Sequence, residues 1–216
     1  QKDSKRGDVS GLMLLLFCFL LPALPGLKLK VQEQRYIFWA IVACYSATAA
    51  INAFWFKVSE ADTDSTVFLA ATQSLGDGAY AGFYPRFLRA CFDIFGQSEL
   101  LGSALSVFAF ALASIIFLRI ADLLEVQNSW ALLPLLALPP SMLIYYSAIL
   151  REPWLLLVLL YGTLNGVRFL KTSAPTHLLL CLGSIAVLAS MHRAFLLWVV
   201  IWLPLMFFSS PGSKKL

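Results

Sequence analysis

Uninterrupted apolar tracts of about 20 residues most constrain what this chain can fold into, since a helix of that length crosses the hydrocarbon core of a bilayer. Hydrophobic residues make up 60% of the 216 residues, and charged residues only 13%. A soluble domain of this size could not hide so much apolar surface beneath a polar shell. The tracts are continuous and do not alternate as barrel strands do, so the sequence predicts an all-α, polytopic membrane helix bundle.

We expect about six spanning helices, and a pair of prolines, Pro139 and Pro140, should break or bend the third. The expected spans are residues 36–56, 99–118, 130–150, 153–170, 176–191 and 194–208. The chain then divides into an N-terminal polar tail with a kinked hydrophobic segment (1–35), the transmembrane helix bundle with its outer loop 57–98 (36–208), and a basic cytoplasmic tail (209–216).

The first hydrophobic segment, Leu12–Leu27, is short for a spanning helix and is interrupted by Pro22 and Pro25. Three interpretations stay open: it spans the bilayer, it is re-entrant or interfacial, or it is a signal sequence removed by cleavage. Basic residues before it and small residues at its end are typical of a signal sequence. The ten residues that precede it are polar and are expected to be mobile.

The distribution of lysine and arginine helps to choose among these interpretations, because basic residues gather on the inner face of a membrane. With the 57–98 loop outside, eight basic residues lie inside and five outside. Lys2, Lys5 and Arg6 join the inner set if the first segment does not cross, and a crossing segment makes the count eight against eight. The charge rule therefore favours a first segment that does not span. The inner eight are Lys28, Lys30, Arg35, Arg119, Arg168, Lys171, Lys214 and Lys215; the outer five are Lys57, Arg86, Arg89, Arg151 and Arg193.

The outer loop carries the pattern of two amphipathic helices lying in the membrane interface. The first begins at Ser59, where a hydroxyl is followed three residues later by a carboxylate, and its apolar residues recur at helical spacing. The second begins at Tyr84-Pro85, where proline is tolerated in a first turn. Gly96 ends this second helix.

Three acidic residues crowd the start of the first loop helix: Glu60, Asp62 and Asp64. Like charges this close repel each other, so a partner is expected: a metal ion, a basic side chain or a proton-donating substrate. A divalent cation is one candidate, although the sequence fixes no cofactor. The alternative is that they are solvated charges at a helix start.

Three polar interruptions share one membrane face in this topology: the long loop, Arg151-Glu152 and His192-Arg193. Ionisable residues at membrane depth usually line a cavity or pair with each other, although short turns between helices must also be polar. Arg151 and Arg193 could bind phosphate in bidentate geometry. Asp62 or Asp64 could then act as a general base on a sugar hydroxyl.

The chain resembles the GT-C-type glycosyltransferases, polytopic enzymes that use polyprenyl-phosphate-linked sugars. The resemblance covers roughly residues 36–208. It is carried by an acid soon after the first firm helix, by the amphipathic helix, and by Phe83-Tyr84-Pro85, Phe95-Gly96-Gln97-Ser98, Pro139-Pro140-Ser141, Ser147 and Arg151-Glu152-Pro153. The second half also resembles membrane polysaccharide polymerases, in which an arginine opens a helix and a histidine, here His192, follows.

The resemblance implies a glycosyltransferase in glycan or polysaccharide assembly on the outer face of a membrane, most simply the bacterial inner (plasma) membrane. By position, the catalytic acid would be Asp62 or Asp64. The implied substrate-binding residues are Tyr84, Arg86, Arg151, Glu152, His192 and Arg193. Such enzymes carry more helices than this chain, so we expect a truncated or minimal relative, or one that has lost the chemistry.

Other classes of function are less well supported. The sequence has no Walker loop, HExxH, paired CxxC or serine nucleophile elbow, and its basic residues lie at tract ends, which argues against a nucleic-acid partner. A non-catalytic scaffold subunit with membrane protein partners is the alternative, since Gly162–Gly166 has GxxxG spacing. A small transporter is the third option, disfavoured by the lack of charges deep in the helices. His177 is expected to cap or anchor a helix, and the four cysteines to be buried hydrophobes.

Overall fold

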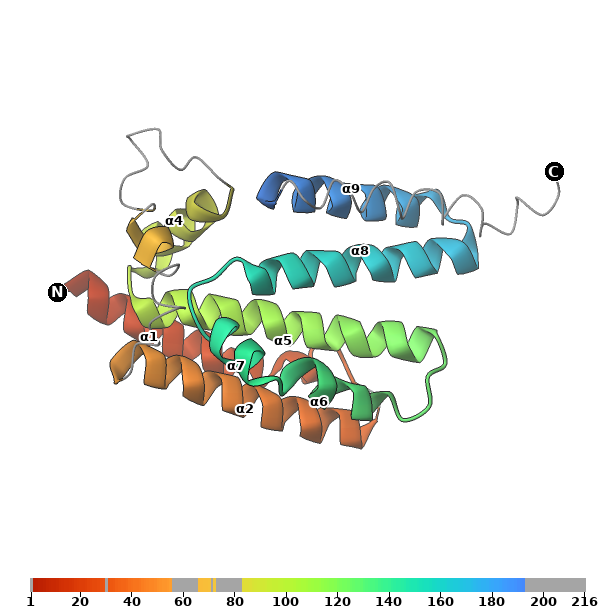
Figure 1. Cartoon of the computed structure of the whole chain (residues 1–216), viewed down its shortest axis with the longest axis horizontal. Coiled ribbons are helices and arrows are strands. Elements are labelled where there is room, and N and C mark those ends of the chain that lie inside the picture. Colours follow the sequence, from red (N-terminus) through yellow and green to blue (C-terminus); the bar gives the residue numbers. More distant parts are fainter. Residues whose placement is uncertain (1, 30, 56–65, 71, 73–82, 193–216) are drawn as a thin grey trace.

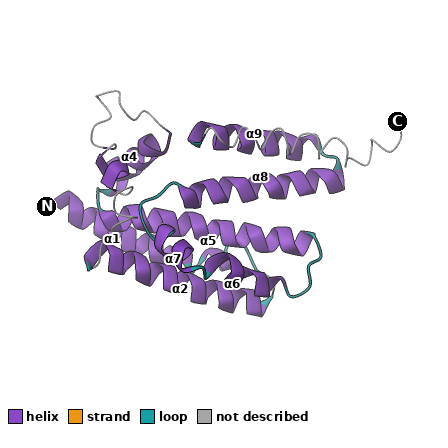
Figure 2. Ribbon diagram, viewed as in Figure 1, coloured by secondary structure: helices purple, strands orange, loops and turns teal. Residues whose placement is uncertain are grey.

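The computed structural model describes residues 2–29, 31–55, 66–70, 72 and 83–192. In these ranges the structure is all-helical, without strands, as predicted (Figure 2). The long helices lie side by side with similar axis directions (Figure 1). In chain order the elements are α1 Lys2–Cys18, η1 Leu21–Ala23, α2 Gln32–Phe54, α4 Phe83–Phe95, α5 Glu99–Leu123, η2 Ser129–Ala131, α6 Leu132–Ala137, α7 Pro140–Tyr145, α8 Glu152–Thr172 and α9 Pro175–Met191. Residues 66–70 are helical as well.

Three helices, α2, α5 and α8, are long and apolar enough to cross a membrane. Helix α9 is apolar but shorter. Helix α5 is buried along most of its length because α1 and α2 pack on it from one side and α8 from another. The expected count of six spans is therefore only partly supported, and the expected last span at 194–208 lies outside the described residues.

The expected span at 130–150 is not one helix but three short pieces, η2, α6 and α7. The break falls at Pro139 and Pro140, as predicted, because proline cannot donate the hydrogen bond that would continue α6. Helix α2 stabilises the broken segment with a buried hydroxyl: Tyr45 Oη donates to the Ala137 carbonyl oxygen at 2.7 Å. Ser147 Oγ donates in return to the Tyr45 carbonyl at 3.2 Å.

The N-terminal residues form a helix where a mobile tail was expected. Helix α1 begins at Lys2 and packs along α5, with Gly11 against the first turn of α5 and Gly7 against residues 96–98 that precede it. A Cβ on Gly11 would lie 2.8 Å from the Leu101 amide nitrogen, so the two backbones approach as closely as glycine allows. Arg6 donates to the Ile94 carbonyl at 2.8 Å and ties the same end of α1 to α4.

The first segment runs beside α5 from its first turn almost to its last. Gly11 lies against Leu101, and Arg119, near the end of α5, donates to the carbonyl of Gly26. Helix α1 begins at the end where α4 lies (Figure 1), but it is not among the described helices that are long and apolar enough to cross a membrane, so the non-spanning first segment stays a prediction.

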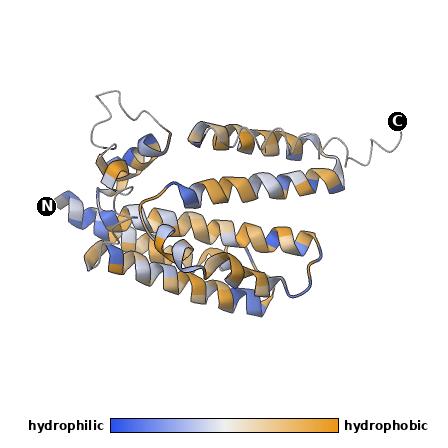
Figure 3. Cartoon of the chain, in the orientation of Figure 1, coloured by the Kyte–Doolittle hydropathy of each residue, from blue (hydrophilic) through white to orange (hydrophobic). Residues whose placement is uncertain are grey.

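Polar residues gather toward the two ends of the bundle and leave its middle apolar (Figure 3). We call the end that holds α4 and the starts of α1, α5 and α8 the α4 end, and the other the opposite end. The described parts of all three polar interruptions lie at the α4 end: α4 itself, Arg151-Glu152, and His192 at the C-terminus of α9. These residues therefore share one end of the bundle, and that this end is one membrane face stays a prediction.

Helix α4 packs against the rest of the protein more closely than expected for a helix that lies in the membrane interface. Its buried stripe includes Tyr84, Leu88 and Phe92, which pack with Leu101 of α5 and with Ile149. The amphipathic pattern was therefore correct, but the apolar face is covered by other helices, whereas large apolar residues on the remaining surface stay exposed. These exposed residues are Phe83, Ile94 and Phe95.

Candidate functional site

The start of α8 places a charged pair at the α4 end. Pro153 suits the first turn of a helix, where its missing N–H costs nothing, and it fixes the point at which the chain leaves the 148–151 segment. Glu152 opens the helix and Arg151 precedes it. The positive end of the α8 dipole stabilises a carboxylate at this position.

The two oxygens of Glu152 have different surroundings. Oε1 lies 3.5 Å from Arg151 Nε, in a partly exposed ion pair. Oε2 is buried and accepts no hydrogen bond from the described part of the chain. Buried carboxylate oxygens normally have a partner, so a simple helix-start acid does not explain this arrangement.

Tyr84 of α4 lies close to this carboxylate. Burial raises the pKa of the Tyr84 hydroxyl well above its usual range; the Ser106 hydroxyl opposes part of this shift, and the negative charge of Glu152 adds to it. The Tyr84 hydroxyl has no hydrogen-bond partner among the described residues. Ser106 Oγ lies nearby but donates to the Leu150 carbonyl at 3.3 Å. Tyr84 is therefore a neutral group whose hydroxyl lies near that of Ser106 but makes no hydrogen bond of normal geometry with it.

Trp154 contributes a third unpaired polar atom. Its indole Nε1 is buried with no acceptor in the described ranges, and its ring stands edge-on to Phe87 of α4 with the centroids 4.7 Å apart. We call Tyr84, Arg151, Glu152 and Trp154 the Glu152 cluster. It combines a guanidinium, a carboxylate acceptor and two neutral donors, and such a set can bind a phosphate and the hydroxyls of a sugar.

The structure brings together some of the predicted site residues and does not describe others. Tyr84, Arg151 and Glu152 come together in the Glu152 cluster. Arg86 is exposed on α4, and His192 follows Met191, which packs near Tyr84. Asp62, Asp64 and Arg193 lie outside the described residues, so the predicted catalytic acids stay a prediction. Sequence reasoning missed Trp154, although its position directly after Arg151-Glu152-Pro153 was an available signal.

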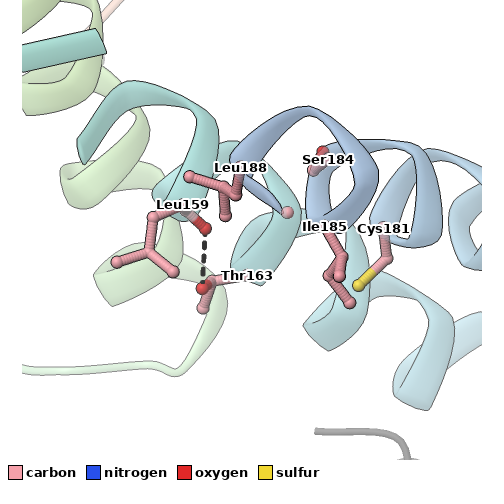
Figure 4. A pocket seen from close by; sticks show the side chains of 7 residues that line it. Leu159, Thr163, Cys181, Ser184, Ile185 and Leu188 are labelled. Atoms are coloured by element: carbon pink, nitrogen blue, oxygen red, sulfur yellow. Dashed lines mark hydrogen bonds between the residues drawn. The ribbon is translucent and has the colours of Figure 1, made fainter. Parts of the chain in front are cut away.

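A small cavity between α8 and α9 is a poor candidate for a substrate site (Figure 4). Its volume is about 20 Å³, which suits one water molecule. The hydroxyls of Thr163 and Ser184 face the cavity but donate to the carbonyls one turn earlier, Leu159 at 2.9 Å and Leu180 at 2.8 Å. Its polar groups are thus already paired.

The described residues contain no group of three His, Cys, Asp or Glu side chains that could hold a metal ion. The cysteines of this part of the chain are free thiols, and Cys18 and Cys181 are buried, as predicted for small hydrophobes. The prediction is wrong for Cys44, which is exposed, and Cys91 is only partly buried. His177, at the start of α9, contacts Asn165 through its Nδ1, 3.2 Å from the amide oxygen. It therefore links α9 to α8.

Fold and site together define an all-α bundle with three helices suited to a membrane and a partly unpaired polar cluster at one end. Comparison with protein families, with characterised proteins and with solved structures finds no match. The structure thus supports the all-helical fold class, and a more specific function has to be argued from the chemistry of the site.

Proposed function

We propose that the chain is an integral membrane glycosyltransferase-like protein that acts on polyprenyl-phosphate-linked sugar during glycan or polysaccharide assembly. The observation that carries the proposal is the Glu152 cluster. Within it, Glu152 Oε2, the Tyr84 hydroxyl and the Trp154 indole are buried without partners in the described part of the chain. Leaving polar groups unpaired is costly unless a ligand pairs them.

In this proposal, Arg151 binds the phosphate of the lipid-linked sugar, because a guanidinium matches phosphate oxygens in bidentate geometry. Glu152 Oε2 accepts a hydrogen bond from a sugar hydroxyl, while Tyr84 and Trp154 donate to sugar oxygens. Asp62 or Asp64 supplies the general base on the acceptor hydroxyl. The outer face in this assignment is the one that holds α4.

The lipid part of the substrate suits the surface beside this cluster. Phe83 and Phe95 are exposed large apolar residues on α4, and α2, α5 and α8 could place them at the boundary of a bilayer. A polyprenyl chain would then stay in the membrane while its phosphate reaches Arg151. The compartment implied by this chemistry is the bacterial inner membrane.

The alternative function is a non-catalytic subunit of a larger membrane complex. Its support is the set of apolar side chains exposed on α6 and α9, such as Leu135 at 74% and Leu179 at 68% exposure, which suit either lipid or partner helices. The GxxxG spacing gives it less support than expected. Gly162 already packs inside the chain, where a Cβ would lie 3.0 Å from the Ser184 Cβ on α9.

Binding of a polyprenyl-phosphate sugar to the purified full chain tests the proposal. We expect saturable binding in detergent, and binding weaker by roughly tenfold or more for the polyprenyl alcohol, which lacks the charged group that Arg151 holds. Native mass spectrometry or titration of a radiolabelled lipid measures both. No binding, together with purification only beside a stoichiometric partner, would favour the scaffold.

A further inference from the structure

A larger cavity lies at the opposite end of the bundle, between the start of α2 and the end of α5. Its volume is about 560 Å³, within the range of small-ligand sites. It is bounded by the residues around Gln34 on α2, by Asp122 on α5, and by Ser129 and Trp130 of η2. No residue of the Glu152 cluster contributes to it.

The side chain of Gln34 is the anomaly in the wall of this cavity. It is 1% exposed, and its Nε2 donates to Asp122 Oδ1 and to Ser129 Oγ, both at 3.0 Å. These two bonds fix which end of the amide is the nitrogen. Gln34 Oε1 is then a buried acceptor with no donor among the described residues. The wall of the cavity therefore lacks a hydrogen-bond donor for Gln34 Oε1.

The charge of the residues that line the cavity indicates whether the donor belongs to an anion or to a cation. Glu33 and Asp122 both line it, and none of its described lining residues is basic. An anion would be repelled by the two carboxylates. A cation is attracted by them, and the indole of Trp130, which also lines the cavity, is the best aromatic partner for a cation.

The position of the cavity indicates where such a cation comes from. Gln34 lies in the first turn of α2 and Asp122 in the last turn of α5, and both helices are suited to span a membrane. In a bilayer spanned by both helices, the cavity would lie where they leave the hydrocarbon and meet the headgroups. Val31 and Val126 add apolar contact surface for methylene groups.

We propose that this cavity binds a primary ammonium group, carried either by the headgroup of phosphatidylethanolamine or by a small free alkylammonium ion. A primary ammonium has three N–H donors, and the cavity offers three acceptors: Gln34 Oε1 and the carboxylates of Glu33 and Asp122. A trimethylammonium group has the same charge but no N–H, so it leaves Gln34 Oε1 unpaired. The site thus distinguishes ethanolamine from choline headgroups.

The test measures the affinity of the purified full chain, in detergent, for short-chain phosphatidylethanolamine, its N-methylated series through phosphatidylcholine, and ethylammonium chloride. We expect affinity to fall with each methyl group, and phosphatidylcholine to bind roughly tenfold more weakly or worse. Tighter binding of the lipid than of ethylammonium identifies the headgroup as the source. Equal affinity for the lipid and for ethylammonium identifies the free amine as the ligand, bound by the same acceptors.

A pair of variants separates the site from general lipid binding. Asp122→Asn keeps the shape and the acceptor oxygen of the side chain, and should weaken phosphatidylethanolamine binding by roughly tenfold. Glu125→Gln removes the same charge from a nearby side chain outside the cavity, 89% exposed, and should leave binding unchanged. Equal affinity for ethanolamine and choline lipids, insensitivity to Asp122→Asn, or binding of anionic phosphatidylglycerol alone would overturn the proposal.

Discussion

Replacing Gly11 with alanine is expected to destabilise the bundle by about 1–3 kcal/mol, the usual cost of overpacking a close contact. The new Cβ would lie 2.8 Å from the Leu101 nitrogen and 2.9 Å from the Leu100 carbonyl carbon. Both are backbone atoms of α5, so relief requires a whole helix to move. The apparent midpoint of thermal unfolding in detergent should fall by about 2–4 °C for each kcal/mol lost.

Gly183→Ala is the matched control, because it makes the same change in an apolar helix where nothing lies within 4 Å of the added Cβ. Alanine is the better helix former, so the midpoint should hold or rise slightly. Gly7→Ala should behave like Gly11→Ala, since its Cβ would meet the Gly96 carbonyl oxygen at 2.8 Å. If Gly11→Ala and Gly183→Ala shift the midpoint alike, the close packing of α1 on α5 is contradicted.

The second large effect is expected at the Glu152 cluster. Arg151→Lys keeps the charge but loses the bidentate guanidinium, and should weaken binding of a polyprenyl-phosphate sugar by roughly tenfold to a hundredfold. Glu152→Gln keeps the shape of the side chain but replaces a charged acceptor with a neutral one, and should cost roughly tenfold. Binding of the lipid-linked sugar, and any sugar transfer measured with it, are the readouts.

Arg89 and Asp93 provide matched controls on the same end of the molecule. They form an exposed i,i+4 ion pair on α4 with an Nε–Oδ2 separation of 3.9 Å, and such pairs contribute little to stability. Arg89→Lys and Asp93→Asn should leave lipid-linked sugar binding within about twofold of the unchanged protein. Equal losses in the control and cluster variants would point to surface charge at this end rather than to a site.

The helical class and the long central helices could be predicted because they follow from local composition. A tract such as residues 99–118 is apolar over a bilayer thickness whatever surrounds it. The break at Pro139-Pro140 was equally predictable, because proline acts through its own ring and missing N–H. The three pieces η2, α6 and α7 were not, since Tyr45 of α2 stabilises the break through a tertiary contact.

The path of the first segment could not be predicted from hydropathy and charge. Its close packing depends on Gly11 against α5 and Gly7 against residues 96–98. These two glycines have a small-residue spacing that falls within a polar stretch, where hydropathy does not indicate a packed helix. The pattern of α4 was found, but an amphipathic stripe is the same whether lipid or protein covers it. Contacts such as those of Leu88 with the core decide between the two.

The candidate site, like the fold, could be predicted only in part. Arg151 and Glu152 were candidates because charges interrupt an apolar tract there, and Tyr84 entered through a resemblance. Glu152 Oε2, the Tyr84 hydroxyl and the Trp154 indole are buried without partners among the described residues. Their burial depends on how α4 packs on α5 and α8. No local pattern encodes this arrangement.

The central claim, a membrane-crossing bundle with its polar cluster at one membrane face, is tested most directly by labelling single cysteines in sealed vesicles. Asp93→Cys on α4 and Glu125→Cys after α5 would be made with the four native cysteines replaced by alanine. Both positions are well exposed, at 71% and 89%. A membrane-impermeant maleimide should modify one of them in intact vesicles and the other only after permeabilisation. Modification of both from the same side would contradict the bundle described above.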